Sequence, residues 1–273
     1  MKRFIPLLFV VVMLATGCPQ PEPEVHQVEM GLYTPYWTMP EILKGKVKEV
    51  VEKNYWAVEE DGKYVKGERL SVAARDTFGW TLDFVATFDE NGNILKCKTI
   101  DENDEVIDIN SLVVKDGKIT SVEYIKEDTV RLVAKSTYND EGVLTKIERF
   151  RMPEDTLNIK AMLVRDENGN VVEWQFYNSD EELTSKYIFT VNQEGRNTGY
   201  KFYNKEGIVT FEQKITYNDK GFMTRLVMVN RDGVESVSEY EYEYDEMGNW
   251  IKAIASEEVE RVIEEREITY YEE

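Results

Sequence analysis

Residues 239–249 read Glu-Tyr-Glu-Tyr-Glu-Tyr-Asp-Glu-Met-Gly-Asn, and this stretch decides the fold. Tyr240, Tyr242 and Tyr244 alternate with glutamates, which places aromatic and charged side chains on opposite faces of an extended strand. The next residues form a turn, because glycine accepts a positive φ and Asp or Asn side chains cap turns. A half-buried strand that ends in a hairpin turn is therefore the expected unit of this chain.

The unit recurs from about residue 80 to the end of the sequence. Turn signals follow one another at intervals of roughly 12 to 15 residues, a spacing typical of all-β chains. Phe84, Ala86 and Phe88 share one strand face, as do Val172, Trp174 and Phe176, Phe211 through Tyr217 at every second position, and the tyrosines above. We expect the turn glycines to be structural and to adopt left-handed backbone conformations: Gly92, Gly142, Gly169, Gly195, Gly207, Gly221, Gly233 and Gly248.

These patterns predict an all-β antiparallel meander of repeated β-hairpins with about 14–17 strands. Open sheets rarely exceed about ten strands, so the sheet must roll into a curved sheet, a spiral or a barrel-like shell. The segment 42–51 fits a short helix by composition, but we predict a strand, because the sheet needs a first edge. An outer-membrane barrel is disfavoured, since charged faces such as Glu239, Glu241 and Glu243 would meet lipid or a packed lumen.

The segment 244–249, Tyr-Asp-Glu-Met-Gly-Asn, resembles the core of the YD, or RHS-type, repeat. Residues 88–93 and 165–170 differ from it at the aromatic position, and residues 138–142, 203–207 and 217–221 have Asn in place of Asp. The resemblance implies β-hairpins that spiral into a shell, as in cell-surface and toxin-carrying proteins. This chain is too short to enclose cargo. It is also similar to the acidic repeat lipoproteins of Bacteroidetes-type bacteria, which implies a surface or periplasmic protein.

The N-terminal sequence predicts where the protein is located in the cell. Lys2 and Arg3 precede an uncharged apolar run from Ile5 to Ala15, and Gly17-Cys18 follows. The run is too short for a spanning helix, and a small residue before a lone cysteine fits a lipoprotein signal with Cys18 acylated. Ala15-Thr16-Gly17 also fits an ordinary signal peptidase site. We expect a protein that is lipid-anchored to the outer membrane and faces the periplasm or the surface.

The expected organisation has four parts. Residues 1–17 form the lipoprotein signal peptide, 18–30 the acylated cysteine and a proline-rich tether, 31–80 an N-terminal capping region with the first strands, and 81–273 the YD-like hairpin repeat domain. The formal net charge is −20, and removal of Lys2 and Arg3 with the signal changes it to −22. This charge excludes nucleic acid as a partner and indicates a soluble surface.

No catalytic or metal site is expected from the residue types. If Cys18 is lipidated, Cys97 has no disulfide partner, and its alternation with Leu95 and Thr99 predicts a small core residue. The single histidine, His26, lies in the tether. Turns such as 89–93 and 166–170 offer oxygen ligands at alternate positions but lack the spacing of an EF-hand. We therefore predict no enzyme, no cofactor and no metal.

Two functional hypotheses remain. The first is a non-enzymatic envelope lipoprotein that binds or scaffolds a glycan or an envelope protein through its sheet; the alternative is an enzyme or accessory of glycan utilisation. Tyr33, Tyr36 and Trp37 lie among prolines outside the repeat. They either cap an open end of the sheet or form a ligand-binding surface, because rigid aromatic side chains dominate binding hot spots.

Overall fold

The computed structural model describes residues 43–74, 83–257 and 260–272. The predicted signal, Cys18, the tether with His26, and the Tyr33, Tyr36, Trp37 cluster lie outside these residues. Helical structure in the described part is limited to residues 72–74. No helix among the described residues is long and apolar enough to cross a membrane.

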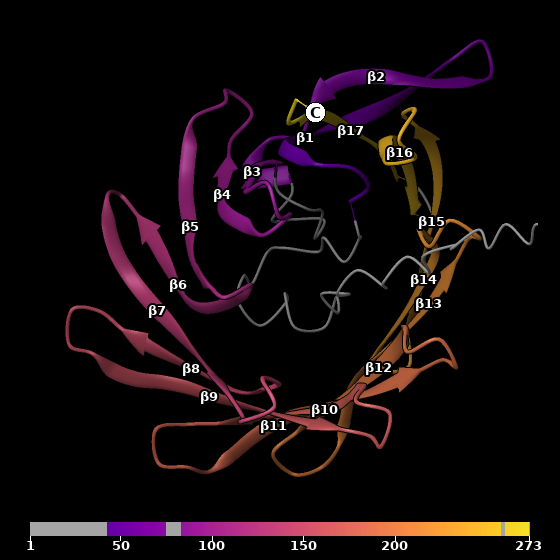
Figure 1. The fold of residues 1–273 in the computed structure, drawn as a ribbon. Coiled ribbons are helices and arrows are strands. Elements are labelled where there is room, and N and C mark those ends of the chain that lie inside the picture. Colours follow the sequence, from indigo (N-terminus) through magenta and orange to yellow (C-terminus); the bar gives the residue numbers. More distant parts are fainter. Residues whose placement is uncertain (1–42, 75–82, 258–259, 273) are drawn as a thin grey trace, which may run out of the picture.

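Seventeen antiparallel strands make up the described part of the chain (Figure 1). They are β1 (Val47–Glu60), β2 (Lys63–Arg69), β3 (Asp83–Phe88), β4 (Ile94–Ile100), β5 (Val106–Lys115), β6 (Lys118–Lys126), β7 (Thr129–Tyr138), β8 (Leu144–Arg151), β9 (Thr156–Arg165), β10 (Val171–Tyr177), β11 (Leu183–Val191), β12 (Asn197–Asn204), β13 (Val209–Tyr217), β14 (Met223–Asn230), β15 (Glu235–Tyr244), β16 (Trp250–Glu257) and β17 (Glu260–Tyr270). The predicted antiparallel meander and its strand number are confirmed, and of the three expected forms the structure shows the barrel-like shell.

The sheet closes into a 16-strand barrel through β1. From β3 to β17 each strand pairs with the next one along the chain, and β1 pairs with β17 on one side and with β3 on the other. The segment expected to supply a first edge is therefore an interior strand of the ring. Residues 55–60 of β1 pair with β2 on the side where residues 49–52 pair with β3. The β1–β2 hairpin projects from the barrel (Figure 1).

The strand registers sort the side chains into two continuous faces. Trp174 lies opposite Tyr187, Tyr187 opposite Phe202, and Phe202 opposite Phe211, so an apolar face passes unbroken from strand to strand. The other face carries ion pairs between or within strands, such as Lys186 with Glu173, Lys201 with Glu212, and Lys252 with Glu243. The predicted alternation of apolar and charged residues is thus present across β10 to β16.

The apolar face lines the inside of the barrel. Side chains converge on the concave wall of a closed sheet and diverge on its convex wall, so the inner residues are the less accessible ones. Val50, Ala86 and Ala253 of the apolar face are all 0% exposed, whereas the side chain of Glu239 on the charged face is 69% exposed. An apolar face turned outward toward lipid would be the accessible one. We therefore call the apolar face the inner wall and the charged face the outer wall.

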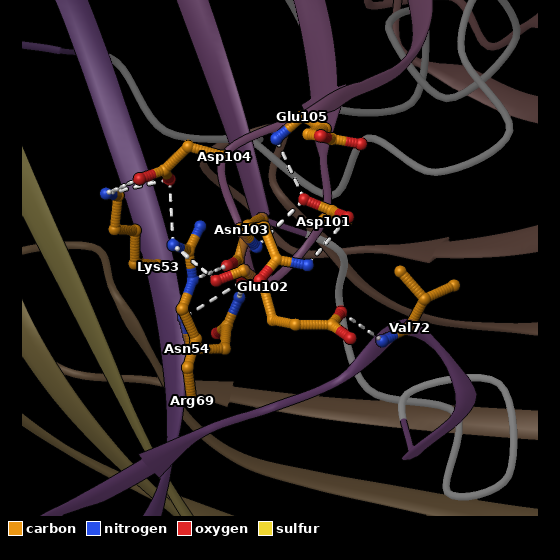
Figure 2. Close-up of polar contacts among 10 residues, drawn as sticks. Lys53, Asn54, Arg69, Val72, Asp101, Glu102, Asn103, Asp104 and Glu105 are labelled. Atoms are coloured by element: carbon orange, nitrogen blue, oxygen red, sulfur yellow. Dashed lines mark hydrogen bonds and ion pairs between the residues drawn. The ribbon is translucent and has the colours of Figure 1, made fainter.

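Most of the hairpin turns share one geometry, which the Asp101 turn in Figure 2 illustrates. The first Asp or Asn accepts the backbone N–H of the residues two and four positions later through its side-chain oxygen; in the turn between β3 and β4, Asp89 accepts from Asn91 and Asn93. The residue at the fourth position has a positive φ. This residue is glycine in most turns, and all eight glycines expected in left-handed conformations have φ between 75° and 92°.

Candidate functional site

Polar side chains interrupt the apolar inner wall where the two ends of the chain meet. In register across β17, β1, β3, β4 and β5, the inner wall presents Arg266, Glu52, Phe84, Thr99 and Asp108 in that order. We call the four polar members of this line the polar row. Alternation along each strand places these residues inside with Val50, Ala86 and Leu112.

Arg266 and Glu52 form a buried ion pair at one end of the polar row. Arg266 Nε donates to Glu52 Oε2 at 2.8 Å, and each side chain is 4% exposed. The guanidinium carbon of Arg266 lies 3.4 Å from the ring centroid of Trp250, so the cation also stacks on an aromatic face. Removal of either side chain would leave the other as an uncompensated buried charge, which is strongly destabilising.

Thr99 and Asp108 occupy the other end of the polar row. Thr99 Oγ1 donates to Asp108 Oδ1 at 2.7 Å, and Asp108 is 4% exposed. Burial raises the pKa of the Asp108 carboxyl above its ordinary value, and the bond from Thr99 and the charge of Lys126 oppose this rise. The carboxyl is therefore easier to protonate than an exposed aspartate.

Cys97 is buried beside this end of the row with a free thiol, as expected of a small core residue. Burial, with smaller contributions from the charges of Asp108 and Glu52, raises the pKa of the thiol to about 12. A thiol with this pKa is not a nucleophile at neutral pH. The expectation that Leu95 shares its face is wrong, because β4 has a bulge opposite Thr87 and Phe88 that leaves Leu95 exposed.

A second ionic cluster fixes the point where the β1–β2 hairpin leaves the barrel (Figure 2). Arg69 Nε donates to the fully buried Asp83 at 2.6 Å, and Arg69 Nη1 lies 2.7 Å from Asp104 Oδ1 in the turn between β4 and β5. Lys53 Nζ lies 2.9 Å from the same Asp104 oxygen. Hydrogen bonds to Lys53 and Arg69 lower the pKa of Asp104. This cluster joins four separate segments and has a structural role.

An aromatic sector covers the inner wall across β10 to β13, on the side of the ring away from β1 and β17 (Figure 1). The ring centroids of Trp174 and Tyr187 lie 5.8 Å apart, those of Tyr187 and Phe202 lie 4.7 Å apart, and those of Tyr200 and Phe211 lie 5.9 Å apart. Edge-on and tilted contacts of this kind are the preferred aromatic geometries. The inner wall therefore has an aromatic side and a polar side.

The acidic turns use their oxygens within the turns. Asp166 Oδ1 accepts from the backbone of Asn168 and Asn170, and Asp166 Oδ2 accepts from Asn170 Nδ2 at 3.0 Å. These bonds lower the pKa of Asp166. A shallow polar recess lies between this turn and residues 191–195. Within the described ranges, no group of three or more His, Cys, Asp or Glu side chains is placed to hold a metal ion.

Sequence reasoning treated strand acids as solvated and so missed the polar row. Glu52 follows Val50 by two positions, Asp108 precedes Asn110 and Leu112, and Arg266 precedes Ile268. The signal was present, because each charged residue occupies the parity that the strand gives to its buried face. A single charged residue at a buried position of a strand can equally mark the end of the strand or a shift in its alternation. Only the pairing of strands far apart in the sequence shows that these charged residues form a line.

No family model matches the chain, and no curated protein matches it. A solved porin-like protein from Bacteroides uniformis has 12% sequence identity and a TM-score of 0.53, over 83% of this chain and 98% of that chain. The likeness is one of fold. A porin-like protein from Bacteroides vulgatus has 10% identity and a TM-score of 0.36, over 82% of this chain and 98% of that chain. A DUF1329 family protein from Desulfovibrio piger has 8% identity and a TM-score of 0.24, over 82% of this chain and 86% of that chain. Neither of the last two adds to the argument.

Proposed function

We propose that this chain is a non-enzymatic binding protein of the cell envelope, held at the outer membrane by acylated Cys18, that takes an elongated apolar or amphipathic molecule inside its barrel. The observation that carries the proposal is the wall across β10 to β16, which is charged on its outer face and apolar and aromatic on its inner face. Sixteen strands are about twice the number whose own inward side chains fill a barrel, so a ring of this size can enclose more than its own lining.

The aromatic sector supports binding of an apolar body. Trp174, Tyr187, Phe202 and Phe211 extend in one line across four strands, and Tyr187 and Phe202 are only partly buried. A sector of rings that retains accessible area on a concave wall is typical of a small-molecule site. The outer wall across β10 to β16 favours water, since Lys and Glu side chains pair on it.

The buried carboxylates support binding rather than catalysis. Glu52 and Asp83 each bond to an arginine, and Asp108 accepts a bond from Thr99. A retaining carboxylate pair for glycan hydrolysis needs carboxyl groups about 5–5.5 Å apart. Three strand steps separate Glu52 from Asp108 along the polar row, a span of about 14 Å. We assign no catalytic residue.

The turn geometry supports a further part of the proposal, that the hairpins are YD-type repeats. The Asp or Asn that opens each motif makes the two backbone bonds described above, which explains why either residue serves there. The aromatic residue before it lies at the strand end; Tyr138 and Tyr217 each donate to a backbone carbonyl of a neighbouring strand.

The test is a fluorescence titration of the purified chain with N-phenyl-1-naphthylamine, a probe that emits in apolar surroundings. We expect saturable binding that weakens at least about tenfold in Phe202→Glu, which places a charge in the aromatic sector. Lys201→Glu is the matched control, because Lys201 is the next residue and lies on the outer wall. Absence of saturable binding, or equal binding by both variants when their melting curves match, would overturn the proposal.

A further inference from the structure

The polar side of the inner wall contains an acceptor with no donor. Asn110 lies on β5, two residues from Asp108 and two from Leu112, and faces Cys97 on β4 and Tyr124 on β6. It is 4% exposed, and within the described part of the chain its side-chain oxygen has no hydrogen-bond partner. Buried polar atoms in proteins are almost always paired, so such an atom calls for a reason.

No donor among the described residues reaches Asn110 Oδ1. Asp108 lies on the same face of the same strand, and its Oδ1 already accepts the hydroxyl of Thr99. The Cys97 thiol beside Asn110 is a weak donor. Lys126, directly opposite Asp108 on β6, is exposed. The outer wall of the same strand carries Ile109 and Ser111, which face away from this point. The hydroxyl of Tyr124, opposite Asn110 on β6, does not donate to this oxygen either, so within the described residues Asn110 Oδ1 is left without a donor.

We propose that Asn110 and Asp108 form the recognition point for the polar end of the bound molecule, and that this end carries a hydrogen-bond donor, such as a hydroxyl, an amide N–H or an ammonium group. This inference rests on the proposed function and names the chemical class of its ligand. The apolar body of the ligand lies toward the aromatic sector on the far side of the ring (Figure 1). A molecule whose polar end only accepts leaves Asn110 Oδ1 unpaired and binds less tightly.

The experiment compares three probes of equal chain length that displace N-phenyl-1-naphthylamine from the full chain: 1-dodecanol, dodecylamine and methyl dodecanoate. The first two donate hydrogen bonds and the third does not. We expect the two donors to bind at least about tenfold more tightly than the ester. In Asn110→Leu this preference should fall toward one, while the affinity for the ester is unchanged.

Ser111→Leu is the matched control, since it places the same side chain one residue away on the outer wall. Asn110→Leu removes an unpaired buried oxygen, so we expect its melting temperature to be equal to or above that of the parent. A fall in melting temperature with the donor preference intact would show that Asn110 is structural and would overturn the inference. Asn110→Ala repeats the comparison if the leucine variant does not fold.

The two proposals fail in different ways. If none of the three compounds displaces the probe, or if the probe itself does not bind, the proposed function fails and the inference fails with it. If all three compounds bind the parent with equal affinity, or if Asn110→Leu and Asn110→Ala retain the donor preference, the binding function stands and the assignment of Asn110 and Asp108 is wrong.

Discussion

Asn249, the last residue of the Tyr244–Asn249 turn, joins the start of the described chain to its end. Its Oδ1 accepts the backbone N–H of Lys44 at 2.7 Å, and its Nδ2 donates to the Lys44 carbonyl and to the hydroxyl of Tyr270, both at 2.8 Å. In the equivalent turn, Asn170 Nδ2 donates to Asp166 of its own turn, and among the described residues it makes no other hydrogen bond. One motif residue therefore caps a turn in one repeat and clamps the entering chain in another.

We expect Asn249→Ala to destabilise the barrel by about 1–3 kcal/mol, because it removes a buried side chain that makes both hydrogen bonds to the Lys44 backbone. Asn170→Ala, which loses a bond to a carboxylate beside solvent, should cost less. Urea unfolding of both variants measures the difference. Equal losses of stability would mean that the contact with Lys44 adds nothing.

Gly92 isolates the conformational demand of the turns. Its φ is 81°, and a side chain added there would meet no atom within 4 Å, so only the backbone opposes substitution. Gly92→Val should lower the free energy of unfolding by more than about 1 kcal/mol, since a β-branched residue resists positive φ. Gly92→Asn should be milder, because Asn tolerates this region. Thermal melts that do not separate Val from Asn would refute this account of the turn.

Asp108 should make stability depend on pH. Its folded pKa lies above the ordinary value of 3.8, so its ionised form destabilises the folded state at neutral pH. As pH falls through the raised pKa, the folded protein takes up this proton before the unfolded chain does and regains that stability. Asp108→Asn should thus be more stable than the parent at pH 7, and the advantage should vanish below about pH 3.8. Denaturant titrations at several pH values test the sign; a gain that grows on acidification would contradict it.

At the scale of elements, the contact between β1 and β17 depends on a charge pair inside an apolar wall. Glu52→Ala leaves Arg266 buried without its carboxylate and should cost about 3–5 kcal/mol. The double variant Glu52→Leu with Arg266→Leu removes both charges and should recover most of that loss, because two apolar side chains suit the neighbouring Val50 and Ile268. Urea titration of the single and double variants gives the coupling. If the double variant is no more stable than the single one, the pair acts through something other than compensated charge.

The elements also show how far local sequence reaches. Each strand and turn could be predicted because the alternation of Tyr240, Tyr242 and Tyr244 and the chemistry of the Asp245 turn lie within about ten residues of one another. The closure of the barrel could not be predicted from local sequence, because β1 meets β17 through pairs such as Glu52 with Arg266, which are 214 positions apart. The polar row could not be predicted either, because its members lie far apart in the sequence. The exposure of Leu95 could not be predicted, because it follows from a β-bulge that no residue type in the segment indicates.

At the scale of the whole molecule, lipidation of Cys18 should determine where the protein is located without affecting its fold. We expect Cys18→Ala to abolish labelling with a clickable fatty acid and to shift the protein from the membrane fraction to the soluble fraction, because no acyl chains can then be attached. Far-UV circular dichroism of the released variant should retain a sheet spectrum, since Cys18 lies outside the described barrel. Equal labelling of the variant and the parent would exclude lipidation at this cysteine.

The closure of the ring by its first and last strands has a kinetic consequence. A meander can form hairpin by hairpin as the chain emerges, but β1 lacks its partner along Val47–Trp56 until residues 262–270 have arrived. Until then both margins of the growing sheet expose unpaired backbone, which invites aggregation and proteolysis. The loop that must close spans nearly the whole chain, and contacts of such long range form slowly. The last seam is thus a checkpoint for maturation: only chains that reach β17 and pair it with β1 lose their vulnerable margins.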